Sequence, residues 1–135
     1  MRTLRLLLAS ALLVTTLAPV SVHAQSGPFA YFGLEPDIIT NYLGSNARKL
    51  GYVRVTVELM LESPDYLEAA EHHSPLLRAS IIEIIGRQPE DKVKSLTGRE
   101  DIRRTCLDEL KRLMKKETGN PMVKDVIFTK YLYQG

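Results

Sequence analysis

Hydrophobic and polar side chains alternate strictly over residues 52–61. The aliphatic positions are Val53, Val55, Val57, Leu59 and Leu61, and the residues between them are Arg54, Thr56, Glu58 and Met60. Successive side chains of a strand point to opposite faces of a sheet. This period of two therefore predicts a strand with one buried aliphatic face.

Two further segments are rich in β-branched and aromatic residues. Residues 31–43 carry Phe32, Ile38, Ile39 and Tyr42 around Pro36, and residues 44–46 follow as a Gly-Ser-Asn turn. Residues 122–133, close to the C-terminus, are mostly Val, Ile, Phe, Thr and Tyr. Both compositions predict strands.

Two short helices are predicted after the alternating strand. Ser63-Pro64 and Ser74-Pro75 each combine a capping hydroxyl with a proline suited to the first helical turn. They predict helices over 65–72 and 75–85, with Gly86 ending the second. Leu77, Ile81, Ile84 and Ile85 would share one face of that helix, although the isoleucine-rich run also fits a strand.

A longer helix is predicted to begin at Thr97 and to run to Glu117, with Gly119 ending it. Thr97 and Glu100 have the spacing of a capping box. An inward stripe is predicted from the spacing of Ile102, Cys106, Leu110 and Leu113. The opposite face carries Arg104, Asp108, Lys111, Arg112 and Lys115. Because Asp108 lies four residues from both arginines, part of this face is expected to be self-paired.

The order strand, strand, helix, helix, helix, strand predicts an α+β fold in which helices pack on a small β-sheet. The first 24 residues precede this domain and read as a secretory signal peptide. Arg2 and Arg5 come before an apolar run at 6–17, and Val22-His23-Ala24 has small residues suited to cleavage between Ala24 and Gln25. Retention as a membrane anchor is the less favoured alternative, because the run is short for a bilayer. Residues 25–135 then form a single domain.

Charge and composition exclude several classes of protein. Without Arg2 and Arg5 the chain has as many basic as acidic residues, 16 of each. A neutral exported domain is a poor candidate for nucleic-acid binding. The single cysteine cannot form an intramolecular disulfide, and its position in the inward stripe predicts a buried apolar side chain.

No catalytic, cofactor-binding or metal site is predicted. Glu71-His72-His73 is the one cluster that resembles a metal or acid–base site, but adjacent helical side chains point about 100° apart and cannot chelate one ion together. Glycines such as Gly98 and Gly119 are isolated and form no phosphate loop. An enzyme is therefore the weakest hypothesis.

Charge is distributed unevenly along the chain. Residues 58–83 contain six acids and one base, Arg78, whereas residues 87–116 contain ten bases and six acids. Two solvated faces would explain this pattern. The sharper hypothesis is head-to-tail assembly of identical subunits, with Arg104, Lys111, Arg112 and Lys115 as the basic interaction surface.

Five segments, in order, resemble the FliL family of flagellar basal-body-associated proteins. They are YFGLEP followed by IITN (31–41), the aliphatic strand (52–61), PLLR (75–78), TGREDIR (97–103) and VKDVIFTKYLYQ (123–134). The last is the most specific, because the family ends on a Val-x-Asp-Val strand that finishes in Gln. The resemblance covers nearly all of residues 31–134.

This resemblance implies a periplasmic domain of stomatin-like, or band-7-like, fold. It implies a non-enzymatic accessory of the flagellar motor that binds and steadies the stator units, with a homo-oligomeric ring around them as a further expectation. The implied location is the periplasm, at the flagellar basal body or peripheral to the inner membrane. Family members usually carry a transmembrane helix, whereas this chain begins like a cleavable signal. The alternative function is a periplasmic band-7-like adaptor without a flagellar role.

Overall fold

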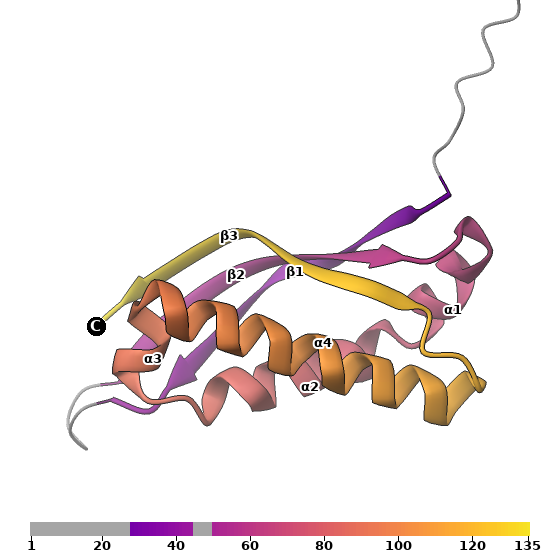
Figure 1. Cartoon of the computed structure of the whole chain (residues 1–135). Helices are drawn as coiled ribbons and strands as arrows, with labels where there is room; N and C mark the ends of the chain where they lie inside the picture. Colours follow the sequence, from indigo (N-terminus) through magenta and orange to yellow (C-terminus); the bar gives the residue numbers. More distant parts are fainter. Residues whose placement is uncertain (1–27, 45–49) are drawn as a thin grey trace, which may run out of the picture.

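Three antiparallel strands form one sheet in the order β1-β2-β3 (Figure 1). The computed structural model describes residues 28–44 and 50–135. Within them β1 is Ala30–Tyr42, β2 is Gly51–Leu61 and β3 is Val123–Gln134. All three predicted strands are confirmed, and the central one is the segment whose polar and apolar residues alternate.

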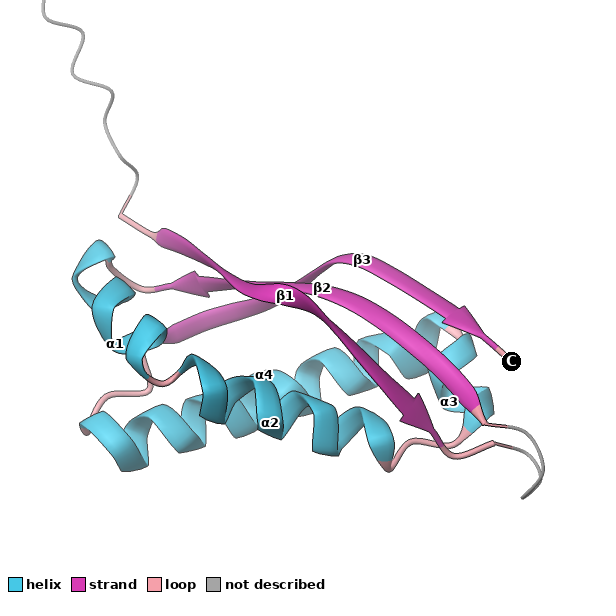
Figure 2. Ribbon diagram, turned by 180° about the vertical axis from the view of Figure 1, so that it is seen from behind, coloured by secondary structure: helices cyan, strands magenta, loops and turns pink. Residues whose placement is uncertain are grey.

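The helices lie between β2 and β3 in the chain. They are η1 (Pro64–Tyr66), α1 (Leu67–His72), α2 (Ser74–Gly86), α3 (Glu90–Lys94) and α4 (Leu96–Thr118). In Figure 2, α2 and α4 run side by side across one face of the sheet, where α2 contacts β1 and α4 contacts β3. The predicted α+β class is confirmed, and the isoleucine-rich run is a helix.

The core lies between this face of the sheet and the two long helices. All five alternating aliphatic residues of β2 are buried, as are Leu77, Ile81 and Ile85 of α2. Burying one such side chain contributes about 1.5–3 kcal/mol. A sheet of three strands therefore derives its stability chiefly from being covered by α2 and α4.

The inward face of α4 differs from the predicted stripe at one position. Its buried side chains include Ile102, Cys106 and Leu110, but the next is Met114, whereas Leu113 is only partly buried. A helix turns 3.6 residues per turn, so a row in steps of four drifts slowly around the axis. Met114 continues that row, and Leu113 packs at the margin of the core.

The start of α4 also differs from the prediction. The cap is Ser95, whose Oγ accepts a hydrogen bond from the Gly98 amide at 3.0 Å, and the predicted Thr97–Glu100 capping box does not form. A Cβ on Gly98 would lie 2.0 Å from the carbonyl oxygen of Lys92, so only glycine allows α3 to approach so closely. The predicted terminator is confirmed, since Gly119 has φ +83°.

Of the two caps predicted for the shorter helices, one forms and the other does not. Ser63 caps η1, with its Oγ accepting from the Asp65 amide at 3.2 Å. Ser74 instead lies inside α2, and the residue before it makes no side-chain cap bond. The chain passes from α1 to α2 with little interruption, because the His73 amide bonds the Ala69 carbonyl oxygen at 3.0 Å.

We expect Val57→Asp to unfold the domain. Val57 is 1% exposed, and an unpaired buried carboxylate costs several kcal/mol. Tyr52→Asp is the matched control, because Tyr52 is 50% exposed on the same strand. Thermal melts followed by circular dichroism check this, and equal midpoints for the two variants would contradict the buried face assigned to β2.

Candidate interaction surfaces

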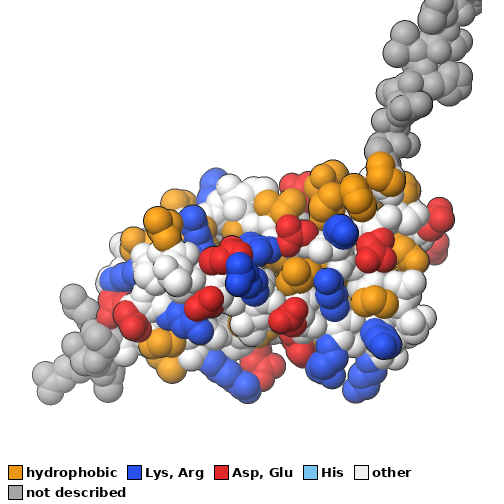
Figure 3. All heavy atoms as spheres, in the orientation of Figure 1, with side chains coloured by type: hydrophobic (Ala, Val, Ile, Leu, Met, Phe, Trp, Pro, Cys, Tyr) orange, Lys and Arg blue, Asp and Glu red, His pale blue; other side chains and the backbone are white. Residues whose placement is uncertain are grey.

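The predicted basic surface consists of Arg104, Lys111, Arg112 and Lys115, all on α4. Arg104, Arg112 and Lys115 are exposed, and Lys111 is half-buried. Figure 3 shows Lys and Arg side chains gathered over the C-terminal half of this helix. The four residues thus lie on one helix, as predicted, but their surroundings differ.

Two of the four form ion pairs within α4. Arg104 Nε lies 3.1 Å from Glu100 Oε1, and Arg112 Nη2 lies 2.6 Å from Glu109 Oε1. The surface is therefore self-paired, but through Glu100 and Glu109 rather than the expected Asp108. No ion pair in the described part of the chain involves Lys111 or Lys115. These two lysines therefore carry the positive charge of the basic surface that no such ion pair neutralises.

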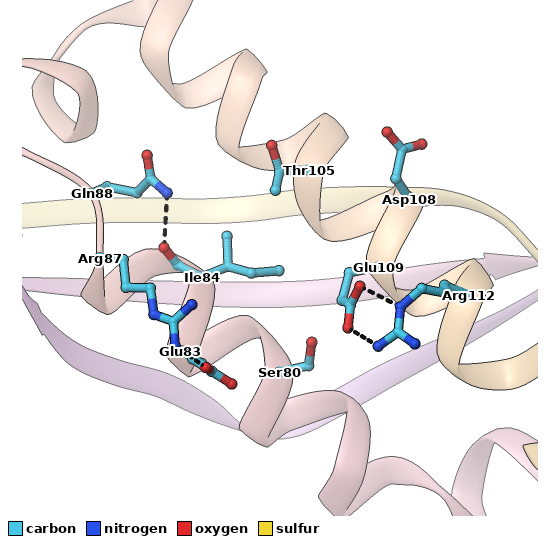
Figure 4. Close-up of a pocket in the computed structure, with 9 residues that line it drawn as sticks. All are labelled: Ser80, Glu83, Ile84, Arg87, Gln88, Thr105, Asp108, Glu109 and Arg112. Carbon is cyan, nitrogen blue, oxygen red and sulfur yellow. Dashed lines mark hydrogen bonds and ion pairs between the residues drawn. The ribbon is translucent and has the colours of Figure 1, made fainter. Parts of the chain in front are cut away.

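Arg112 lies on the wall of a groove between α2 and α4. The groove encloses a cavity of about 550 Å³ (Figure 4). Its walls carry the Glu83–Arg87 pair, at the end of α2, and the Glu109–Arg112 pair on α4. Hydrogen bonding from Arg112 lowers the pKa of Glu109. The four charged side chains of these two pairs therefore neutralise each other within the groove.

An acidic surface lies on the other flank of the molecule. Its exposed carboxylates are Asp65, Glu68 and Glu71, on η1 and α1. Because α1 packs against β1 and α4 against β3, the acidic and basic surfaces flank opposite edges of the sheet. This placement suits head-to-tail contacts between copies.

The histidine cluster lies beside the carboxylates of this acidic surface. His72 and His73 meet edge to face with their ring centroids 4.9 Å apart. They line a shallow cavity of about 560 Å³ with Asp65, Glu68 and Glu71. Over residues 28–44 and 50–135, no three His, Cys, Asp or Glu side chains are grouped so that they could hold a metal ion.

Cys106 is buried in the core, as predicted. Burial raises the pKa of its thiol to about 12. The thiol is therefore protonated at neutral pH, and nucleophilic chemistry, which requires the thiolate, does not fit this position.

Two arginines that the sequence analysis did not single out tie the edge strands to the helices. The first is Arg78 on α2. Its Nη1 donates to the carbonyl oxygens of Leu34, at 3.0 Å, and Pro36. These oxygens lie where the pairing of β1 with β2 shifts register, between Leu34 and Ile38. Arg78 thus stabilises a bulge in β1 that the sheet alone would leave partly unbonded.

The second is Arg103 on α4. It donates to Glu100 through two nitrogens, at 2.7 and 2.8 Å, and through Nη1 to Asp125 Oδ1 at 2.5 Å and the Val126 carbonyl at 3.1 Å. The hydrogen bonds from Arg103 lower the pKa of Glu100 to about 2. Arg78 and Arg103 lie within the PLLR and TGREDIR segments, and only the fold identifies their partners on the strands.

The remaining predicted site lies outside the described residues, since Ala24 and Gln25 precede residue 28. Among the residues that are described, no helix is both long enough and apolar enough to cross a membrane.

Comparison with known proteins agrees with the family resemblance found in the sequence. A family model described as "Flagellar basal body-associated protein FliL" matches residues 31–134. The chain is also 26% identical over 103 residues to the "Flagellar protein FliL" of Aquifex aeolicus (strain VF5). That alignment covers 76% of this chain and 60% of the relative, so the chain spans about three fifths of its length. The family match covers all five helical segments and all three strands except Ala30, the first residue of β1.

We expect Glu100→Gln to lower the melting temperature most at neutral pH. The pKa of Glu100 is about 2 in the folded protein, below the usual 4.5, so its ionised form stabilises the fold above about pH 4.5. This contribution is lost as the pH falls towards 2. The gap in melting temperature between wild type and variant should therefore narrow from pH 7 to pH 2. Glu62→Gln, at an exposed position, is the control, and a gap independent of pH would contradict the assigned ion pair.

Proposed function

Since this chain belongs to the FliL family of flagellar basal body-associated proteins, we propose that it acts in the periplasm as a non-enzymatic accessory of the flagellar motor. In this role it binds and steadies the stator units. The observation that carries the proposal is the family match over residues 31–134, which spans the described domain almost completely.

The surface that fits this role best is the outward side of α4. Lys111 and Lys115 are one helical turn apart, and no ion pair within the described residues neutralises them. A partner with acidic side chains gains from both lysines without first breaking an internal pair. Arg104 and Arg112 flank them, but would have to exchange Glu100 and Glu109 for the partner's carboxylates.

A ring of identical subunits is the proposed form of the assembly. The acidic surface of Asp65, Glu68 and Glu71 flanks β1, and the basic surface flanks β3. A heterologous contact between the two surfaces can repeat from copy to copy and closes when the rotation permits. Such contacts would hold copies around a stator unit and leave the core undisturbed.

We expect the double reversal Lys111→Glu with Lys115→Glu to weaken assembly and stator binding several-fold without unfolding the protein. Exposed ion pairs are each worth about 0.2–1 kcal/mol, so both charges are changed together. The effect should be larger at low salt, because screening is then weaker. Sedimentation velocity across a salt series measures assembly, and co-purification of stator subunits and swimming speed measure function.

The matched control is Lys124→Glu with Lys130→Glu, which makes the same charge change at exposed positions on β3. A thermal melt confirms that each variant is folded. If the folded α4 variant assembles, retains stator subunits and swims like the control at every salt concentration, the α4 surface is a solvated helix exterior. Normal swimming in a strain that lacks the protein would instead favour a periplasmic adaptor without a flagellar role.

We also expect cleavage between Ala24 and Gln25, which would release the domain into the periplasm. The short apolar run at 6–17 and the small residues before the cut support this expectation. Intact-mass analysis of the protein from its native host measures it. A mature protein that retains Met1 would show that the segment is kept as an anchor.

A further inference from the structure

The free edge of β3 is bonded in its first half and open in its second. β3 is an edge strand, paired on one side with β2. The Val126 amide donates to Asp125 Oδ1 at 2.8 Å, and the Val126 carbonyl oxygen accepts from Arg103 at 3.1 Å. Neither bond is made to β2, so the backbone groups of Val126 point towards the free edge.

The register shows which later residues point the same way. Ile127 pairs with Glu58, and Lys130 pairs with Thr56, with a shift between Thr56 and Val57. Backbone groups alternate in direction along an antiparallel strand. Those of Phe128 therefore face the free edge, as do those of Tyr131 beyond the shift. In the described part of the chain, no hydrogen bond is made to these groups from that side.

The opposite edge of the sheet is bonded at its register shift and just beyond the end of β1. Arg78 bonds the Leu34 and Pro36 carbonyl oxygens, and the Leu43 amide donates to the Gln88 carbonyl oxygen at 2.9 Å. Leu43 also forms a parallel bridge with Pro89. Unprotected strand edges pair readily with other chains, and proteins usually cover them. The open stretch of β3 around Phe128 is therefore an available site for strand addition.

A groove runs between this stretch and the start of α4. It encloses a cavity of about 350 Å³, bounded by residues 125–129 and Tyr131 on β3 and by Arg99, Glu100 and Arg103 on α4. Figure 3 shows acidic and basic side chains side by side between β3 and the first turns of α4. The groove thus presents backbone hydrogen-bonding groups on one wall and charged side chains on the other.

Arg99 is the charge in this groove that remains available. Arg103 already binds Glu100, Asp125 and a carbonyl oxygen. Arg99 is exposed, and no ion pair within residues 28–44 and 50–135 includes it. Its guanidinium carbon lies 5.4 Å from the centre of the Tyr131 ring. The Tyr131 hydroxyl donates to the Val93 carbonyl oxygen at 2.7 Å, which fixes the ring that supports Arg99.

We propose that this groove binds an extended peptide segment of a partner protein, which adds as a fourth strand to β3 at Phe128 and places a carboxylate side chain against Arg99. The backbone bonds would supply affinity, and the carboxylate would select the peptide and fix its register. This site is separate from the stator contact proposed on the outward side of α4, and it does not rest on that function.

The test is selection from a phage-displayed library of random nonapeptides against the chain produced with its own N-terminal segment. We expect the enriched peptides to contain Asp or Glu and to slow hydrogen exchange of the Phe128 amide at least tenfold in NMR spectra. Two synthetic copies of the best peptide are then compared, one methylated at its odd-numbered backbone nitrogens and the other at its even-numbered ones. Strand addition uses every second amide, so one copy should lose binding and the other should retain it.

Arg99→Gln should weaken binding of the same peptide about tenfold, measured by fluorescence anisotropy. Arg87→Gln is the matched control, because Arg87 is an exposed arginine just after α2 and outside this groove. The Lys111→Glu with Lys115→Glu variant should bind the peptide like the wild type, which separates this site from the stator contact.

Three results would overturn the proposal. The first is a selection in which no enriched peptide slows exchange at Phe128. The second is an equal effect of Arg99→Gln and Arg87→Gln on binding. The third is protection of the Phe128 amide without peptide that disappears on dilution, because the edge would then be occupied by a second copy of this chain.

Discussion

The fold depends on covering a single face of a three-stranded sheet. The central strand contributes five buried aliphatic side chains, from Val53 to Leu61, and its own sheet cannot shield them from water. A sheet with one apolar face must pack that face against another layer. The helices α2 and α4 form that layer, α2 packing against β1 and α4 against β3, on either side of β2. Exposed charges are consequently confined to the outer sides of the helices and to the open face and edges of the sheet.

Because the helices must stay on this face of the sheet, two partly exposed arginines contribute to holding the helices and edge strands together. Both edge strands depart from regular pairing. In β1 the register shifts between Leu34 and Ile38, and in β3 Thr129 has no partner residue on β2. Arg78 supplies donors for carbonyl oxygens at the first irregularity, and Arg103 joins α4 to Asp125 and Val126 on the other edge strand. Each arginine therefore satisfies polar groups of a strand and also positions a helix over the core.

Local periodicity was sufficient to predict the strands, the long helices and the burial of Cys106, because each of these depends on neighbours within a few residues. The sequence did not predict that Ser95 would cap α4 or that Met114 would replace Leu113 in the buried row. Those outcomes depend on the close approach of α3 to Gly98 and on the packing of α4 against β3. The candidate basic residues were placed correctly on α4, but their partners Glu100 and Glu109 were missed. Spacings of three and four residues on a helix are nearly equivalent, so spacing alone could not choose between Asp108 and Glu109.

The two proposed contacts would differ in physical character because they use different parts of this architecture. Lys115 is exposed, Lys111 is half-buried, and neither belongs to the core, so each contact through them is weak and depends on salt. Weak contacts suffice when they are repeated around a ring, because each additional copy is held at high effective concentration by its neighbours. The edge of β3 is held in place, since its other side is bonded to β2 and Arg103 joins it to α4. A peptide added there loses only its own conformational freedom, and the strand needs no rearrangement to receive it. The outward side of α4 is thus suited to assembly that salt can reverse, and the edge of β3 to recognition of one particular segment.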